Sequence, residues 1–222
     1  MFKLLLQISL FLKALIIYFV TAIVSYIATI PPGPLSVYAV HTTLQKNIKI
    51  ALWVALGGIL GEMGYTYLAI EGVMIFDKYP AVVFWIQWGI IALLLVVGTI
   101  TFFHKDAKIE PENIKVKGRF LSIFKGITLS LLTPALFPFW VIVLLEYKKH
   151  DFLTINTISD KVSFLAGAET GTFLLVYTYA YITERKRNVI FKYLTDNRLN
   201  KLMGVLYIGL AVWQLVNMVV EP

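Results

Sequence analysis

Long apolar stretches separated by short polar ones run through the whole chain. Six of them are long enough to cross a bilayer, which takes about 20 residues of helix. They cover roughly residues 13–40, 48–76, 80–103, 120–145, 162–183 and 199–220. The connections between them leave no room for a separate soluble domain. The pattern therefore predicts an all-α membrane protein with six transmembrane helices.

The first twelve residues fit two interpretations. Leu4 to Leu12 is apolar and lies between Lys3 and Lys13, so it either extends the first helix or lies flat at the membrane interface. We expect the extension, because a tilted helix accommodates more than the ~20 residues that a span needs.

The composition is that of a membrane protein. Hydrophobic residues make up 59% of the 222 and charged residues 15%, against about 25% in soluble domains. The net charge of +7 could suggest nucleic acid, but the basic residues lie in short loops between apolar segments, as the positive-inside rule requires. We therefore predict contact with the lipid bilayer and none with nucleic acid. The absence of cysteine excludes disulfides, thiolate metal sites and membrane thiol–disulfide reductases.

Lysine and arginine are unevenly distributed among the loops. Fourteen of the twenty lie in the loops that follow the first, third and fifth segments or near the start of the segment after each loop. By the positive-inside rule these loops are cytoplasmic, and both termini then lie outside the cytoplasm. We predict a multi-pass protein of the inner membrane.

Two glutamates lie well inside apolar segments, away from the segment ends, where an ionised side chain near the bilayer centre costs about 2.5–3.5 kcal/mol on insertion scales. Glu62 and Glu169 are each followed, two residues later, by a glycine, and each comes about thirty residues after a proline cluster. Carboxylates in matching places in the two halves predict a site that binds a coupling proton or a cationic group of a substrate. The alternative is a pair of structural glutamates that are neutral or paired.

The proline clusters predict interruptions in the first and fourth helices rather than ordinary kinks. Proline has no amide donor and clashes with the carbonyl four residues earlier. Backbone groups freed in this way are tolerated in a membrane only against protein or a water-filled cavity. We expect these interruptions to contribute to substrate binding, at Ile30, Pro31, Pro32, Gly33 and Pro34 in the first helix and at Thr133, Pro134 and Pro138 in the fourth.

The two halves of the chain share one plan: a broken helix, a helix with Glu-x-Gly, and a plain helix. A unit of three spans begins on opposite sides of the membrane in its two copies, so the copies are inverted, as in many secondary transporters. The predicted units are residues 1–103 and 120–222, and residues 104–119 form a cytoplasmic linker between them.

Small residues accompany both glutamates at a spacing that lets helices approach closely. We expect them to pack helices, at Gly57, Gly58, Gly61 and Gly64 in the second segment and at Gly167 and Gly171 in the fifth. Such glycine faces also make a homodimer plausible. Among the aromatics, Tyr65 lies one turn from Glu62 and is the best candidate for the site. Tyr67, Trp140, Tyr177 and Tyr179 could also line a pathway, but the membrane interface or lipid is the expected place for most of these aromatics.

The chain lacks the signatures of common metal sites and enzymes. His41, His104 and His150 all lie at segment ends, so a histidine metal site is not expected. There is no HExxH zinc motif, no P-loop and no GxSxG elbow. We predict no catalytic residue, no metal and no cofactor.

Three features follow one another in the first half: a Pro-Gly-Pro break, a basic loop, and a glycine-rich helix with an acidic residue directly after glycine. They are residues 32–34, Lys46 with Lys49, and Gly61 with Glu62. Together with the stretch from Phe124 to Trp140, these features resemble the lysine-exporter family of LysE/RhtB-type proteins. The resemblance implies a secondary transporter that exports amino acids or similar small metabolites, driven by a proton or membrane potential gradient.

Two departures from that family bear on the substrate. Glu62 stands where the family usually has aspartate, and residues 133–135 read Thr-Pro-Ala where it usually has Asn-Pro-Lys. The substrate therefore cannot be carried over from lysine export. Two other functions stay open: a divalent-cation exporter of the same superfamily, with both glutamates as oxygen ligands, and a membrane enzyme or assembly factor that transports nothing.

Overall fold

The computed structural model describes residues 2–30, 33–76, 80–103, 118–131, 133, 136–186 and 198–220. Within these residues every regular element is a helix. The helices are α1 (Phe2–Thr29), α2 (Pro34–Gln45), α3 (Ile48–Phe76), α4 (Pro80–Phe103), α5 (Arg119–Leu131), α6 (Leu136–Lys148), α7 (Ile158–Arg185) and α9 (Arg198–Val220).

These bounds confirm the helices that the apolar pattern predicts. The first and fourth segments are each divided in two, at 30–33 and at 132–135. α1 begins at Phe2, so the first residues extend the first helix rather than forming an element of their own. α2 begins with Pro34, where a missing amide costs nothing because the first helical amides have no partner in any case.

Among the described residues, two helices are long and apolar enough to cross a membrane: Gln7–Thr29 and Ile48–Val73. The pair formed by α5 and α6 is a third if it counts as one span bent by 67° at its break. The described structure is thus all-helical with two or three membrane-capable helices, and the expected total of six remains a prediction.

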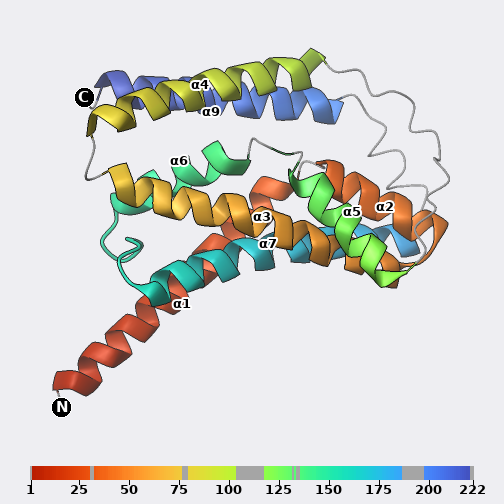
Figure 1. Cartoon of the computed structure of the whole chain (residues 1–222), viewed down its shortest axis with the longest axis horizontal. Coiled ribbons are helices and arrows are strands. Elements are labelled where there is room, and N and C mark those ends of the chain that lie inside the picture. Colours follow the sequence, from red (N-terminus) through yellow and green to blue (C-terminus); the bar gives the residue numbers. More distant parts are fainter. Residues whose placement is uncertain are drawn as a thin grey trace.

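The helices α3 and α7, which carry the two glutamates, pack against each other and organise the rest (Figure 1). α1 lies along α7 and α5 lies along α3, while the shorter α2 and α6 complete the layer. α4 and α9 lie side by side along one face of this assembly (Figure 1). Both ends of the chain lie at the same end of the helices, on the left of Figure 1.

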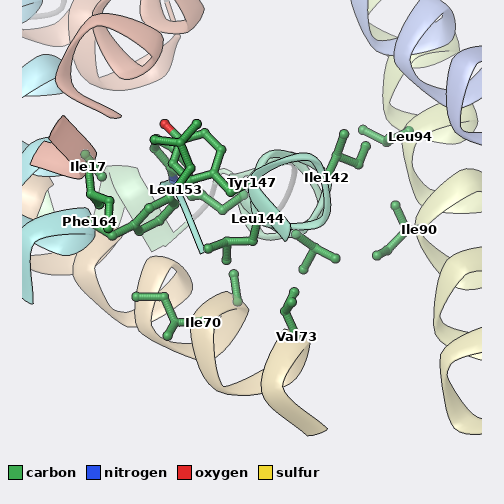
Figure 2. Close-up of a cluster of buried hydrophobic side chains, with 14 of the residues drawn as sticks. Ile17, Ile70, Val73, Ile90, Leu94, Ile142, Leu144, Tyr147, Leu153 and Phe164 are labelled. Atoms are coloured by element: carbon green, nitrogen blue, oxygen red, sulfur yellow. The ribbon is translucent and has the colours of Figure 1, made fainter. Parts of the chain in front are cut away.

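The main hydrophobic core joins helices that are distant in sequence (Figure 2). Ile17 from α1 and Phe164 from α7 are fully buried, and Leu94 from α4 closes the far side of the cluster. The rings of Tyr147 and Trp140 from α6 meet Phe164 edge-on, at centroid distances of 5.6 and 5.3 Å. Such aromatic pairs add about 0.5–1.5 kcal/mol to the burial of their area, so α6 is held firmly between α1, α3 and α7.

Two glycines of α3 bring its backbone against α5. A Cβ on Gly57 would lie 2.0 Å from the carbonyl oxygen of Ile123, and a Cβ on Gly61 would lie 2.0 Å from Oγ of Ser130. Gly58 contacts α2, where a Cβ would lie 2.3 Å from Cδ2 of Leu35. At Gly57 the atoms in the way are backbone, so only glycine allows α3 to approach α5 this closely.

The corresponding glycines of α7 do the same against α1. A Cβ on Gly167 would lie 2.5 Å from the carbonyl oxygen of Tyr18, and one on Gly171 would lie 2.4 Å from that of Ala22. The glycine faces of α3 and α7 are therefore covered within the chain, by α5 and α1. They give no support to a homodimer, because they are not available to a second copy.

Gly64 differs from the other glycines of α3. It is exposed, and a Cβ there would meet no atom within 4 Å. The expectation that it packs helices is not met, since it points away from α5 and α2.

We expect Gly57→Ala and Gly64→Ala to change stability in opposite directions. The first forces a methyl group into the backbone of α5 and should lower the free energy of unfolding by about 1–3 kcal/mol. The second replaces an exposed helical glycine and should raise it by up to about 1 kcal/mol. Thermal unfolding of the purified protein in detergent measures both. A Gly57→Ala protein as stable as the wild type would contradict the close approach of α3 and α5.

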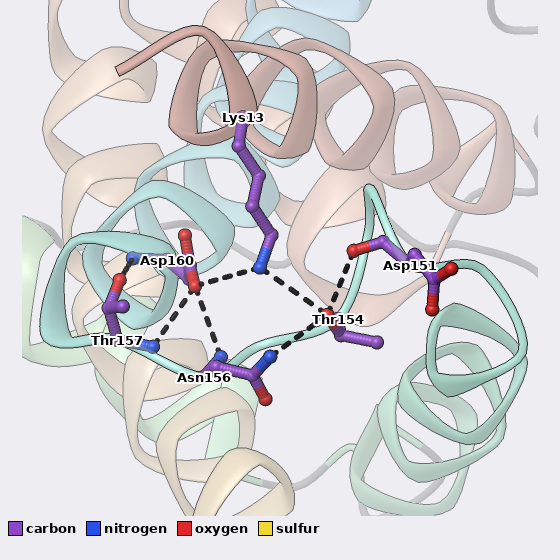
Figure 3. Close-up of polar contacts among 6 residues, drawn as sticks. All are labelled: Lys13, Asp151, Thr154, Asn156, Thr157 and Asp160. Carbon is purple, nitrogen blue, oxygen red and sulfur yellow. Dashed lines mark hydrogen bonds and ion pairs between the residues drawn. The ribbon is translucent and has the colours of Figure 1, made fainter. Parts of the chain in front are cut away.

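A polar network fixes the start of α7 to α1 (Figure 3). Nζ of Lys13 lies 3.3 Å from Oδ2 of Asp160 and 3.3 Å from Oγ1 of Thr154. The same Oδ2 accepts hydrogen bonds from the amides of Asn156 and Thr157, at 3.1 and 3.0 Å. The hydroxyl of Thr157 in turn accepts from the amide of Asp160, at 3.1 Å, which completes a capping box.

Asp160 is 1% exposed and precedes the apolar part of α7. Burial alone would raise its pKa, but the hydrogen bonds from Asn156, Thr157 and Lys13 outweigh burial and hold the pKa below its usual value. A lowered pKa means that the ionised side chain stabilises the fold.

The contribution of Asp160 should therefore depend on pH. It is fully present above the pKa of the unfolded chain, about 3.9, and is lost as the pH falls through the lower pKa of the folded protein. Asp160→Asn should cost about 1.5–3 kcal/mol at neutral pH, and its difference from the wild type should shrink below about pH 4. Unfolding between pH 3 and pH 7 tests this. Glu146→Gln is the control, because its ion pair with Lys149 is exposed, and it should change little at any pH.

Candidate substrate and ion site

A cavity of about 400 Å³ lies where the two breaks meet α3 and α7. Thr29, Gly33 and Pro34 line it from the first break, and Thr133 and Leu136 line it from the second. The wall also contains the aromatic side chains Phe139, Trp140 and Tyr207 and the polar side chains Ser25, Ser36, Glu62 and Thr172. Among the described residues that line it, none is a lysine, arginine or histidine.

Glu62 is the carboxylate of this cavity. It lies midway along α3 and is 7% exposed. Its carboxyl group is within hydrogen-bonding reach of Thr172, whose hydroxyl lies 3.1 Å from that of Ser25. Ser25 donates to the carbonyl of Ala168 at 2.6 Å. These hydrogen bonds connect α1 to α7 beside Glu62.

Glu169 lies close to Glu62 but does not line the same cavity. It is 8% exposed, and its Oε1 is 3.3 Å from Oγ1 of Thr66, one turn along α3 from Glu62. Its Oε2 is buried without a hydrogen-bond partner among the described residues. The two carboxyl groups are close enough to interact electrostatically. Glu169 instead borders a second, mostly apolar depression between α3 and α7.

At the first break, the backbone freed by the prolines is satisfied by a tyrosine from the other half of the chain. α1 ends at Thr29, and the carbonyl of Ile30 accepts a hydrogen bond from the hydroxyl of Tyr179 on α7. Gly33 is extended, with φ −80° and ψ 178°, and precedes α2 without a side-chain cap. Pro31 and Pro32, also predicted to contribute, lie outside the described residues.

The second break is satisfied in the same way from the first half. The carbonyl of Leu131, at the end of α5, accepts a hydrogen bond of 2.7 Å from the hydroxyl of Tyr65 on α3. The amide of Thr133 donates to Ser130 at 2.9 Å, and Leu136 donates to Thr133 at 3.2 Å.

Pro134 and Pro138 are the prolines predicted to contribute at this break. Pro134 lies outside the described residues. Pro138 lies inside the first turn of α6 and not in the break, because a proline is tolerated where the helix has no use for its amide. Pro138 is buried, and the cavity is lined instead by its neighbours Leu136, Phe139 and Trp140.

Tyr65 and Tyr179 differ in how far the sequence predicts their positions. Tyr65 is expected at the site and lies beside it, holding backbone at the second break rather than lining the cavity. Tyr179 is among the aromatics that could line a pathway, although the interface or lipid is expected for most of them. It is 6% exposed and contacts the first break. Its proximity to Ile30 depends on the packing of α7 against α1 and α2, and no local pattern in the sequence indicates it.

The residues do not assemble a metal centre in the described part of the chain. No group of three histidine, cysteine, aspartate or glutamate side chains there could hold a metal ion. Hard divalent cations take six or more oxygen ligands, and Glu62 with its hydroxyl neighbours offers a much weaker set.

The fold and the cavity together define a helical membrane protein with a mostly apolar chamber, containing a few polar side chains, between two broken helices, the plan of a transporter. The sequence profile of the LysE type translocators matches residues 26–218, and the chain belongs to that family. Its members are transporters and not enzymes, and membership makes this protein a membrane exporter of small molecules. No curated protein and no solved structure matched the chain.

We expect Tyr65→Phe to weaken the second break. Without the hydroxyl, the carbonyl of Leu131 loses its partner, which should lower the free energy of unfolding by about 1–3 kcal/mol. Amide hydrogen exchange around residues 131–136 should also become faster. Tyr67→Phe on the same helix is the matched control, because Tyr67 is 52% exposed. Equal stability of the two variants would show that the Tyr65 hydroxyl contributes nothing.

Proposed function

We propose that this protein is a secondary transporter of the inner membrane that exports amino acids or similar small metabolites from the cytoplasm. A proton gradient or the membrane potential drives export. The observation that carries the proposal is the position of Glu62, a buried carboxylate in the wall of the cavity at which both interrupted helices meet. Burying a carboxylate in such a place costs desolvation energy, and the binding of a ligand accounts for that cost.

The cavity can receive both charged ends of an amino acid. Glu62 suits an ammonium group. At the other pole, the first turn of α2 presents the amides of Leu35 and Ser36, which make no backbone hydrogen bond to a described residue. The start of a helix carries partial positive charge, so this turn suits a carboxylate. Phe139 and Trp140 offer an apolar wall for the remainder of the molecule.

We propose further that residues 1–103 and 120–222 are inverted copies of a three-span unit, joined by the cytoplasmic linker 104–119, with both termini outside the cytoplasm. The helix contacts support this relation: α1 lies on α7 as α5 lies on α3, each through a pair of glycines four residues apart. A tyrosine from each half also donates a hydrogen bond to a backbone carbonyl of the other half, so these contacts are reciprocal as well. Alternating access then requires one unit to rock against the other around the cavity.

Glu62→Gln should abolish export and leave membrane insertion and folding intact, because it removes the charge and nearly preserves the shape. The measurement is gradient-driven flux of amino acids in proteoliposomes, with candidate substrates chosen from a metabolite survey of the medium of expressing cells. Glu146→Gln, a change at the exposed end of α6, is the control and should transport normally. Wild-type flux by the Glu62→Gln protein would refute the proposed site.

A further inference from the structure

Thr66 gives information on the protonation of Glu169. Its Oγ1 lies 3.1 Å from the carbonyl oxygen of Glu62 and 3.3 Å from Oε1 of Glu169. A threonine hydroxyl has a single proton to donate but can also accept. A carbonyl can only accept, so the bond to Glu62 uses the proton of Thr66. A proton shared between the carbonyl of Glu62 and Glu169 would make both bonds weak, whereas a protonated Glu169 that donates to Thr66 allows both to form fully.

The other oxygen of Glu169 is consistent with this conclusion. Oε2 is buried without a hydrogen-bond partner among the described residues, a condition that costs much more for a carboxylate than for a neutral acid. The ionisable group that faces Glu169 from α3 is Glu62. From α1, the hydroxyl of Tyr18 donates to Thr170, and Ser25 bonds Ala168 and Thr172. α2 packs on α7 further along, at Leu175 and Tyr179.

No ion pair of Glu169 or Glu62 with a lysine or arginine is present in the part of the chain that the structure describes. Their charges are therefore not balanced by a neighbouring cation, and each would repel the other if both were ionised. A single proton on Glu169 removes the repulsion and leaves Glu62 charged towards the cavity.

Glu169 also lies beside a depression that is not the substrate cavity. It borders a depression of about 460 Å³ between α3 and α7, separate from the substrate cavity. The lining is apolar apart from Glu169 and Thr170, and its rim includes Val162 and Leu174, which are 59% and 47% exposed. In a membrane such a rim faces lipid. We call this depression the α3–α7 groove.

We infer that the two glutamates have different ligands: Glu169 is the proton-binding carboxyl group, held by Thr66, and Glu62 is the group that meets the substrate. The α3–α7 groove makes Glu169 a modification site for apolar carboxyl reagents that dissolve in lipid. The coupling role of the proton rests on the proposed export function. The protonation of Glu169 and its reactivity do not.

The reagent that tests this is dicyclohexylcarbodiimide. The carboxyl proton of Glu169 moves to one carbodiimide nitrogen, and the carboxylate oxygen bonds to the central carbon, giving an O-acylisourea. The acyl group then migrates to nitrogen, and the stable N-acylurea keeps every atom of the reagent. The reaction needs the protonated acid, so it reports the proton as well as access from lipid.

The experiment is peptide mapping by mass spectrometry of the full chain in liposomes after treatment with dicyclohexylcarbodiimide at a series of pH values. We expect an adduct on Glu169 at neutral pH that disappears as the pH rises. It should be absent from Glu169→Gln and should persist on Glu169 in Glu62→Gln. An adduct confined to Glu62, or none on Glu169, would overturn the assignment.

Infrared spectroscopy tests the proton without relying on access for the reagent. At neutral pH, the carbonyl band of a protonated carboxyl group should be present in the wild type and in Glu62→Gln and lost in Glu169→Gln. Identical bands in the wild type and Glu169→Gln would overturn the protonation.

Substitutions of Thr66 test which group donates the hydrogen bond between Thr66 and Glu169. If Thr66 accepts from a neutral Glu169, Thr66→Val removes a partner of the protonated form and should weaken proton binding about threefold to tenfold. The pH at which labelling is half lost then falls, by about half a unit to one unit. Thr66→Ser should restore it. A rise in this pH would mean that Thr66 donates to an ionised carboxylate, and would overturn the inference.

Transport measurements separate this inference from the proposed function. Glu169→Gln should no longer respond to an imposed pH gradient, and any substrate exchange that it retains should be independent of pH, whereas Glu62→Gln should lose exchange altogether. A Glu169→Gln protein that still follows the pH gradient would overturn the coupling role alone. Absence of all transport by the wild type would refute the export function, while the adduct and the infrared band would still decide the protonation.

Discussion

Backbone polar groups inside a bilayer must find partners within the protein, and this requirement explains how the molecule is held together. Ile30 and Leu131, at the ends of α1 and α5, have carbonyls that are bonded from outside their own helices. Each is bonded by the hydroxyl of a tyrosine from the other half of the chain, Tyr179 and Tyr65 respectively. An unsatisfied carbonyl in hydrocarbon costs several kcal/mol. The interruptions therefore depend on close packing of α3 and α7 against helices far away in the sequence.

That packing depends on glycine. Gly57 and Gly61 bring α3 against α5, and Gly167 and Gly171 bring α7 against α1. Lipid tails are as apolar as leucine side chains, so helices in a membrane gain by close contact and by hydrogen bonds rather than by the hydrophobic effect. The short interhelical distances bring the tyrosines, hydroxyls and carboxyl groups within reach of one another. The same contacts create the cavity between the two breaks and determine which polar side chains enter it.

The neighbouring glutamates illustrate how similar sequence contexts lead to different environments. Both are about equally buried and both precede a glycine by two residues. Glu62 lines the cavity with Thr172 beside it, whereas Glu169 contacts Thr66 and borders the α3–α7 groove. We propose that the carboxyl groups in these two environments bind different ligands. This division suits an exporter that couples a solute to a proton.

The amino-acid sequence by itself determined the helices, because apolar runs, proline breaks and capping residues act locally. The ends of α3 and α4 and the extension of α1 through residues 2–12 followed from such patterns. So did the division of the first segment ahead of Pro34. The tertiary structure alone decided the rest. Pro138 lies in α6 rather than in the break, and Gly64 is exposed. The glycine faces of α3 and α7 pack against helices of the same chain, and Tyr179 bonds the carbonyl of Ile30. The reason is geometric: the partner of a side chain depends on how helices distant in sequence are rotated and spaced, and local spacing along the chain does not contain that information.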